Sequence, residues 1–253
     1  MNAWVVSLCV LLVLFASVAV GAVLRAVLPE QHLNKDSREI IHLCIGLVGT
    51  LAALVLGLLI SSAKASFDSK TLETQQIAVG VVLLDQALRQ YGPESAAARK
   101  PLLAATTAVL AHAQGRAAAL PTSAARWTAF ESFQALQLSV LALAPGSDAQ
   151  RWQQTHALTL VDSVSRDTEM LHAHEGSSLP QPFLFILVFW LGIIFGSLAL
   201  FSPGNATVRA VMMVCALSAS GAIFLILEMD RPFSGWISIS AEPLSSALAV
   251  VGR

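Results

Sequence analysis

The chain has 253 residues, of which 55% are hydrophobic and 12% are charged, and its formal net charge is −1. Soluble domains carry about 25% charged residues, so half that share in a chain of this length indicates a membrane protein. The 15 Lys and Arg residues nearly balance the 16 Asp and Glu residues, which excludes a charge-driven nucleic-acid binder and an acidic or basic tail.

Four apolar stretches are long enough to cross a bilayer, which needs about 20 apolar residues in a helix. They cover residues 2–24, 40–63, 182–201 and 210–227, and none contains a charged residue. The first stretch lacks a positively charged start, so we expect a membrane span there and not a signal peptide. The sequence therefore predicts an all-α membrane protein with four transmembrane helices.

A polar insert between the second and third spans, residues 64–181, carries most of the charge and has helical patterning. Its first helix is predicted from apolar residues at helical spacing, and Gly92 and Pro93 follow as a stop signal. Those apolar residues are Ile77, Val81, Leu84, Leu88 and Tyr91. No breaker separates the second span from this helix, so we expect one continuous rod from residue 40 to 91; the alternative is a break near Ser61 and Ser62.

Three further helices complete the expected helical bundle. One covers residues 95–114, where Pro101 would kink it unless the helix starts later. The next carries Trp127, Phe130, Phe133 and Val140 on one side. The last opens with a capping box at Ser147 and places Trp152, Leu160, Val164 and Leu171 along one stripe.

The expected organisation has four parts. Residues 1–63 form the first two spans, and 64–181 form an extramembrane helical domain. Residues 182–230 form the last two spans, and 231–253 form an interfacial segment with a short C-terminal helix.

Small residues at spacings of three and four mark one face of the second span and part of the third. Functionally, such a face lines a narrow permeation path; structurally, it is a seam where helices approach closely. Both interpretations stay open for these residues: His42, Gly46, Gly49, Thr50, Ala53 and Gly57 in the second span, and Gly192 and Gly196 in the third.

The end of the fourth span concentrates charge. Glu228 and Arg231 are three residues apart and can pair on one helix face, and ionisable groups at membrane depth tend to be functional. Asp230, Pro232 and Phe233 complete a candidate coupling or gating segment. The alternative is an ordinary helix end with a salt bridge and an aromatic anchor.

Signatures of catalysis and of metal binding are missing. Glu169, His172, His174 and Glu175 are close in sequence, but only two of them share a helix face at a time, which leaves a metal site incomplete. There is no phosphate loop, dinucleotide fingerprint, HExxH motif or GxSxG elbow. We therefore expect neither an enzyme nor a cofactor.

Several segments resemble the bestrophin-like domain family of bacterial inner-membrane proteins. They are LVLGLLISSAKASFD (54–68), LLDQALRQYGPES (83–95), SPGNATVRA (202–210), CALSASGAIFLILEMDRPFSG (215–235) and ISAEPLSSAL (239–248). The resemblance implies four transmembrane helices with a helical domain between the second and third. Bestrophins proper are oligomeric anion channels, so it also implies an oligomer whose termini and insert face the cytoplasm. The acidic calcium cluster of bestrophins is matched here only by Glu228 and Asp230, with Glu242 further on.

Two hypotheses follow. The leading one is an oligomeric ion channel or transport-related protein of the inner membrane, gated or assembled by its insert, with the bilayer, copies of itself and small inorganic ions as partners. The rival is a membrane-anchored scaffold without transport activity. Lysines and arginines near the spans are equally numerous on the two sides, so the positive-inside rule does not orient the chain.

Overall fold

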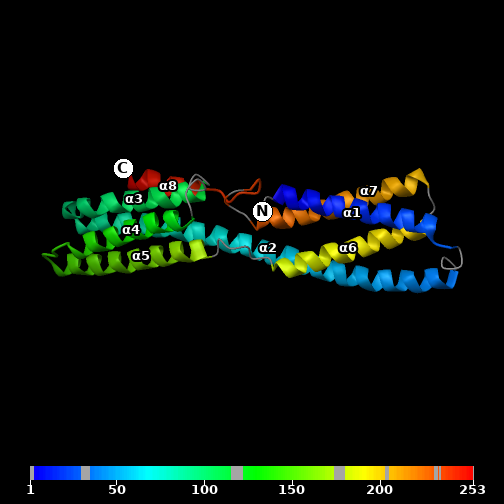
Figure 1. The fold of residues 1–253 in the computed structure, drawn as a ribbon. Coiled ribbons are helices and arrows are strands. Elements are labelled where there is room, and N and C mark those ends of the chain that lie inside the picture. Colours follow the sequence, from blue (N-terminus) through cyan, green and yellow to red (C-terminus); the bar gives the residue numbers. More distant parts are fainter. Residues whose placement is uncertain are drawn as a thin grey trace. The chain divides into compact units, whose positions relative to one another are not determined.

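The computed structural model describes residues 3–29, 35–114, 122–173, 180–202, 205–230, 233 and 235–252, with the side chains of all except 35–37 and 122–129. Every regular element in these ranges is a helix (Figure 1). The all-α fold class predicted from the sequence is confirmed.

Four helices are long and apolar enough to cross a membrane. They are α1 (Ala3–Val27), the part Arg38–Tyr91 of α2, α6 (Gln181–Phe201) and α7 (Ala206–Met229). Each contains all or nearly all of one predicted apolar stretch, which confirms the four predicted spans and their place before and after the insert.

The helix α2 (Lys35–Tyr91) runs for 57 residues without interruption, so the alternative break at Ser61 and Ser62 does not occur. The contacts between residues divide the chain into two units, and α2 contributes to both. The membrane unit comprises Met1–Ala65 and Ser178–Asp230, and the insert unit comprises Ser66–Ser177 and Arg231–Arg253. The segment that follows the last span thus belongs to the same unit as the insert helices.

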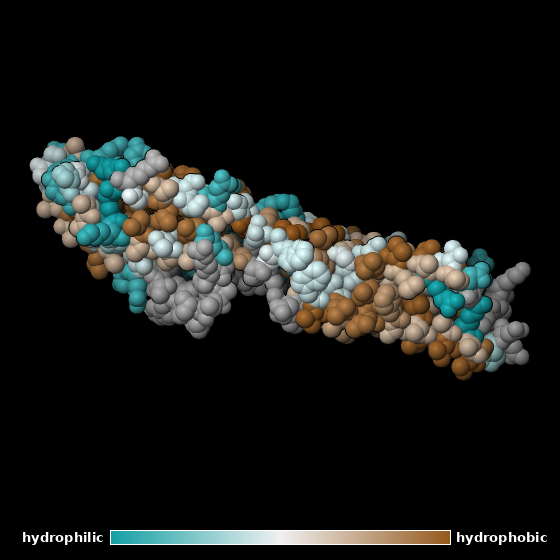
Figure 2. All heavy atoms as spheres, turned by 90° about the horizontal axis from the view of Figure 1, so that it is seen from above, coloured by the Kyte–Doolittle hydropathy of each residue, from teal (hydrophilic) through white to brown (hydrophobic). Residues whose placement is uncertain are grey.

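In the membrane unit, α1 packs against α6 and α7. Ser17 lies opposite Gly192, and Gly21 lies opposite Gly196, so α1 and α6 run in the same direction (Figure 1). The end of α1, the end of α6 and the start of α7 therefore lie at one end of this unit. Figure 2 shows its mainly hydrophobic surface in brown, with hydrophilic residues in teal at one end.

Two serines join α1 to α7 inside the membrane unit. The hydroxyl oxygens of Ser7 and Ser220 are 2.9 Å apart, and the Ser220 hydroxyl also donates to the Ser7 carbonyl at 2.8 Å. Trp4 packs against Phe224 one turn away, with the two rings tilted and their centroids 4.6 Å apart. Small hydroxyl residues let membrane helices approach closely and bond to each other, so these four residues hold α7 antiparallel to α1.

The insert unit is built from the second part of α2, α3 (Ala96–Ala113), α4 (Thr122–Leu141), α5 (Asp148–Ala173) and α8 (Glu242–Val251). Its core includes the five α2 residues of the predicted apolar seam, each at most 3% exposed. They are Ile77, Val81, Leu84, Leu88 and Tyr91. The seam prediction is confirmed.

The turns between insert helices follow the predicted stop and start signals. Gly92 has φ of 126°, a left-handed conformation that glycine adopts at little cost, and a short helix η2 (Pro93–Ser95) leads into α3. The α3 helix continues through Pro101. At the start of α5, the Gln150 N–H donates to the Ser147 hydroxyl at 3.2 Å, while the Gly146 N–H donates to the Gln150 side chain at 2.9 Å.

Trp152 differs from its prediction. It is 63% exposed and stacks on His156 with ring centroids 5.2 Å apart. At 3.6 residues per turn, Trp152 lies roughly 120° around the helix from Val164, which is buried. Val164 and Leu171 are buried as predicted and Leu160 packs partly buried against the core, and α5 also buries Ala157 and Val161 on this side.

An ionic cluster fixes the C-terminal helix to the insert unit. The carboxylate of Asp85, only 1% exposed, accepts hydrogen bonds from Arg89 Nε at 2.6 Å and Arg99 Nε at 2.8 Å. The same two guanidinium groups donate to the carbonyls of Val250 and Val251, each at 3.0 Å. The last carbonyls of a helix have no partner within it, so the two arginines cap α8.

Candidate permeation face and control segment

The α2 stripe, the small and polar residues predicted for the second span, lies at the surface of the subunit. Gly49 is half-buried and the other members are exposed. A Cβ atom added to Gly46, Gly49 or Gly57 would meet nothing within 4 Å. The α2 stripe comprises His42, Gly46, Gly49, Thr50, Ala53 and Gly57.

Another face of α2 holds it to the membrane unit. Ala52, Leu59 and Ala63 are at most 4% exposed and join the core formed by α1, α6 and α7. Of the 18 residues in its most apolar stretch, 11% are buried, against 17% in α1 and α6 and 28% in α7. Within the described part of the subunit, the second span therefore leaves most of its surface exposed, including most of the α2 stripe.

The polar side chains of the α2 stripe have local contacts. The Thr50 hydroxyl donates to the Leu47 carbonyl in its own helix at 2.7 Å. The His42 ring meets the ring of Phe201 edge-on, with centroids 5.9 Å apart. One turn earlier, Arg38 donates to the Phe201 carbonyl at 2.9 Å and so caps α6 at its negative end.

The glycines of the third span lie in a different environment from the α2 stripe. A Cβ added to Gly192 would lie 3.1 Å from the Ser17 hydroxyl, and one added to Gly196 would lie 3.3 Å from the Ser17 carbonyl. A Cβ on Gly21 of α1 would lie only 2.1 Å from the Gly196 carbonyl oxygen. These residues form the tight seam between α1 and α6, separate from the α2 stripe.

Sequence reasoning missed the α1 side of this seam. Ser17 and Gly21 are four residues apart, which is the same small-residue spacing that singled out Gly192 and Gly196. Applied to the first span, the rule for close helix packing would have found them.

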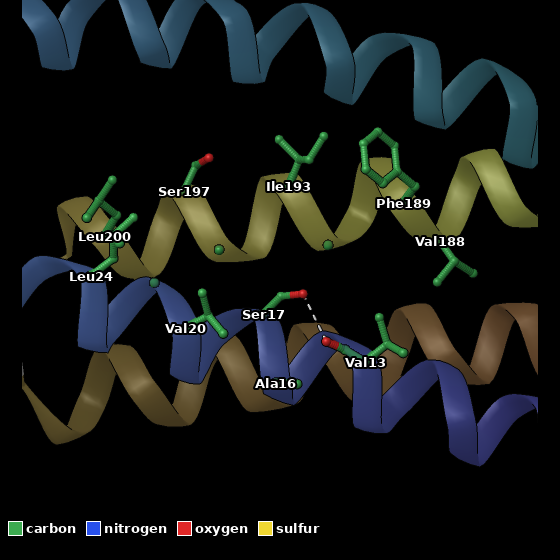
Figure 3. Close-up of a pocket in the computed structure, with 13 residues that line it drawn as sticks. Val13, Ala16, Ser17, Val20, Leu24, Val188, Phe189, Ile193, Ser197 and Leu200 are labelled. Carbon is green, nitrogen blue, oxygen red and sulfur yellow. Dashed lines mark hydrogen bonds between the residues drawn. The ribbon is translucent and has the colours of Figure 1, made fainter.

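An apolar groove of about 540 Å³ runs along the α1–α6 seam (Figure 3). Its polar side chains are Ser17, whose hydroxyl donates to the Val13 carbonyl at 2.9 Å, and Ser197. No residue lining this groove is charged, so apart from the two serines it presents an apolar surface.

The coupling or gating segment predicted at residues 228–233, here called the control segment, begins with two buried acids. Glu228 is 3% and Asp230 is 8% exposed at the end of α7. Arg231 and Pro232 lie outside the described residues, so the structure does not describe the predicted Glu228–Arg231 pair. Phe233 is half-buried and packs against the core of the insert unit.

Two histidines from different helices lie next to the control segment. Their proximity was not predicted from the sequence. The rings of His112 at the end of α3 and His172 near the end of α5 have centroids 4.7 Å apart. The Phe233 ring lies 5.4 Å from that of His112, and His172 Nδ1 lies 2.7 Å from the Thr168 carbonyl. Helical spacing within one helix cannot reveal such a pair, because its members come from different helices.

No group of three metal-binding side chains occurs within the described part of the chain. His174 and Glu175, which sequence spacing places near Glu169 and His172, lie outside that part.

A model of the bestrophin-like domain matches residues 10–244 of the chain. Three solved structures of a bacterial bestrophin homolog from Klebsiella pneumoniae, each with a different mutation, have a similar fold. The first has 14% sequence identity and a TM-score of 0.71, and the match covers 100% of this chain and 99% of that one. The second has 14% identity and a TM-score of 0.65, covering 96% and 98%; the third has 15% identity and the same score, covering 97% and 99%. A comparison with curated proteins yields no match.

Proposed function

The chain belongs to the bestrophin-like domain family, and on this premise we propose that it forms a homo-oligomeric anion channel of the bacterial inner membrane. In this proposal the α2 stripe lines the permeation path. The observation that carries it is the exposure of a small, polar helix face on the span that is least buried within the subunit.

The composition of the α2 stripe supports a path and not contact with lipid. Contact with lipid chains does not favour small residues over large apolar ones. Small residues are favoured where helices pack closely and where a conduction path is narrow. Gly46 and Gly49 have no side chain to narrow a path, and the imidazole of His42 supplies a donor for an anion. Copies of α2 gathered around an axis would bring these groups together.

The insert is proposed to assemble or gate the oligomer. The segment from Glu228 to Phe233 begins in the last turn of α7. Phe233 packs against the insert core, and its ring lies 5.4 Å from that of His112. By analogy with bestrophins, the insert and both termini face the cytoplasm.

The test is chloride flux from liposomes that contain the purified full-length protein, with Gly49→Leu compared against Gly221→Leu. Neither added Cβ meets an atom within 4 Å in the subunit, but Gly49 is on the α2 stripe and Gly221 is on α7. We expect flux above that of empty liposomes, at least tenfold lower in Gly49→Leu and unchanged in Gly221→Leu. Equal chloride flux from the two variants would contradict the proposal that α2 lines the permeation path.

A scaffold remains the second candidate, and one observation favours it. The hydroxyl of Thr50, the most polar group near the middle of the α2 stripe, is already bonded within its own helix. In a scaffold, the stripe would serve only as a seam between copies. A folded oligomer that passes no chloride at several pH values, and that dissociates in Gly49→Leu, would support the scaffold over the channel.

A further inference from the structure

A second groove in the membrane unit combines an apolar wall with two arginines. It has a volume of about 530 Å³ and lies between α1, the end of α6 and the start of α7. None of the residues that line it is acidic. Its lining includes Phe15, Ala19, Arg25, Ser202, Arg209 and Met213.

The charged side chains lie at one end of the groove, and the apolar side chains line the rest of it. Arg25 is in the last turn of α1, and Arg209 is in the first turn of α7. The apolar lining residues precede Arg25 in α1 and follow Arg209 in α7, so both helices place the charge at the same end of the groove. From Phe15 to Arg25, α1 rises about 15 Å, which is about half of the ~30 Å hydrocarbon thickness of a bilayer.

The helix dipoles do not account for both arginines of this groove. Arg25 is favourable at the negative end of α1, but Arg209 is a cation at the positive end of α7. The first turn of α7 has no acidic residue, and the side chain of its N-cap, Asn205, does not bond to the first turn. Within the described part of the chain, neither Arg25 nor Arg209 has an ion pair, whereas Arg38 at the same end caps α6.

We propose that this groove binds an anionic phospholipid of one leaflet, with its phosphate between Arg25 and Arg209 and an acyl chain along Phe15, Ala19 and Met213. Guanidinium groups bind phosphate oxygens through paired N–H donors, and basic pockets between membrane helices bind anionic head groups. The depth of about one leaflet matches a lipid better than a free anion.

Binding is tested by native mass spectrometry of the full-length protein in detergent. The probes are phosphatidylglycerol, phosphatidylcholine with the same acyl chains, and inorganic phosphate. We expect phosphatidylglycerol to bind in preference to phosphatidylcholine, and its affinity to fall roughly fivefold for each of Arg25→Gln and Arg209→Gln.

The acyl-chain part is tested with a matched pair of substitutions on α1. Ala19→Trp fills this groove, whereas Ala16→Trp, three residues away and also exposed, fills the uncharged groove along α6. Loss of phosphatidylglycerol binding in Ala19→Trp alone supports the proposal, provided that both variants keep the oligomeric state of the wild type. Equal binding of the two lipids, an unchanged affinity in both arginine variants, or binding of inorganic phosphate without any lipid preference would overturn it.

Discussion

Gly21 is the position in the membrane unit where an added methyl group should cost most. In Gly21→Ala the new Cβ would lie 2.1 Å from the Gly196 carbonyl oxygen, whereas even a close carbon–oxygen contact needs about 3.3 Å. The obstacle is backbone, so α1 and α6 must separate by roughly 1 Å. Overpacking of this kind costs about 1–3 kcal/mol, and the higher helix propensity of alanine returns about 0.5–1 kcal/mol.

We therefore expect Gly21→Ala to lower the free energy of unfolding by about 1 kcal/mol, and by no more than about 2.5 kcal/mol. The measurement is reversible unfolding of the full-length protein in mixed micelles with increasing SDS, followed by tryptophan fluorescence. Gly221→Ala is the control, because its Cβ meets nothing within 4 Å, and it should be neutral or stabilising. Gly192→Ala should fall between them, since the Ser17 hydroxyl that it meets can rotate away. If Gly21→Ala is as stable as Gly221→Ala, the seam is not as tight as described.

Three further predictions concern polar groups. Asp85→Asn should cost about 1.5–3 kcal/mol and speed hydrogen exchange in α8, because the arginines that cap it lose their anchor; unchanged exchange there would contradict the clamp. Ser220→Ala should cost about 0.6–1.7 kcal/mol in the SDS assay, and with Ser7→Ala in place it should cost much less. Burial raises the pKa of Asp167 above its ordinary 3.8, with Arg166 opposing and Glu73 adding to the rise. Since a raised folded-state pKa removes stability as pH rises through it, Asp167→Asn should raise the melting temperature at pH 7 but not below about pH 4.

The two small-residue patterns, one in the second span and one in the third, show what helical spacing in the sequence cannot predict. The spacing of Gly192 and Gly196 in the third span is like that of Gly49, Ala53 and Gly57 in the second, and both predict a face suited to close approach. In the structure, α1 covers the first pair, while a Cβ added to Gly46, Gly49 or Gly57 of the α2 stripe would meet no described atom within 4 Å. Helical periodicity identifies a face that differs from the rest of its helix, but it does not say what covers that face.

The sequence by itself determined the membrane class, the four spans and the apolar seam of the insert, and it favoured an unbroken α2, which the structure confirms. These depend on apolar length, on helical spacing and on the positions of glycine and proline, which act over a few turns of one helix. Only the tertiary structure decided that Asp85 anchors the arginines at α8 and that Arg25 and Arg209 share a groove. Asp85 and Arg89 are four residues apart on one helix, but Asp85–Arg99, the arginine contacts to α8 and the Arg25–Arg209 groove join residues more than ten positions apart. Chain folding brings such residues together in ways that no local pattern records.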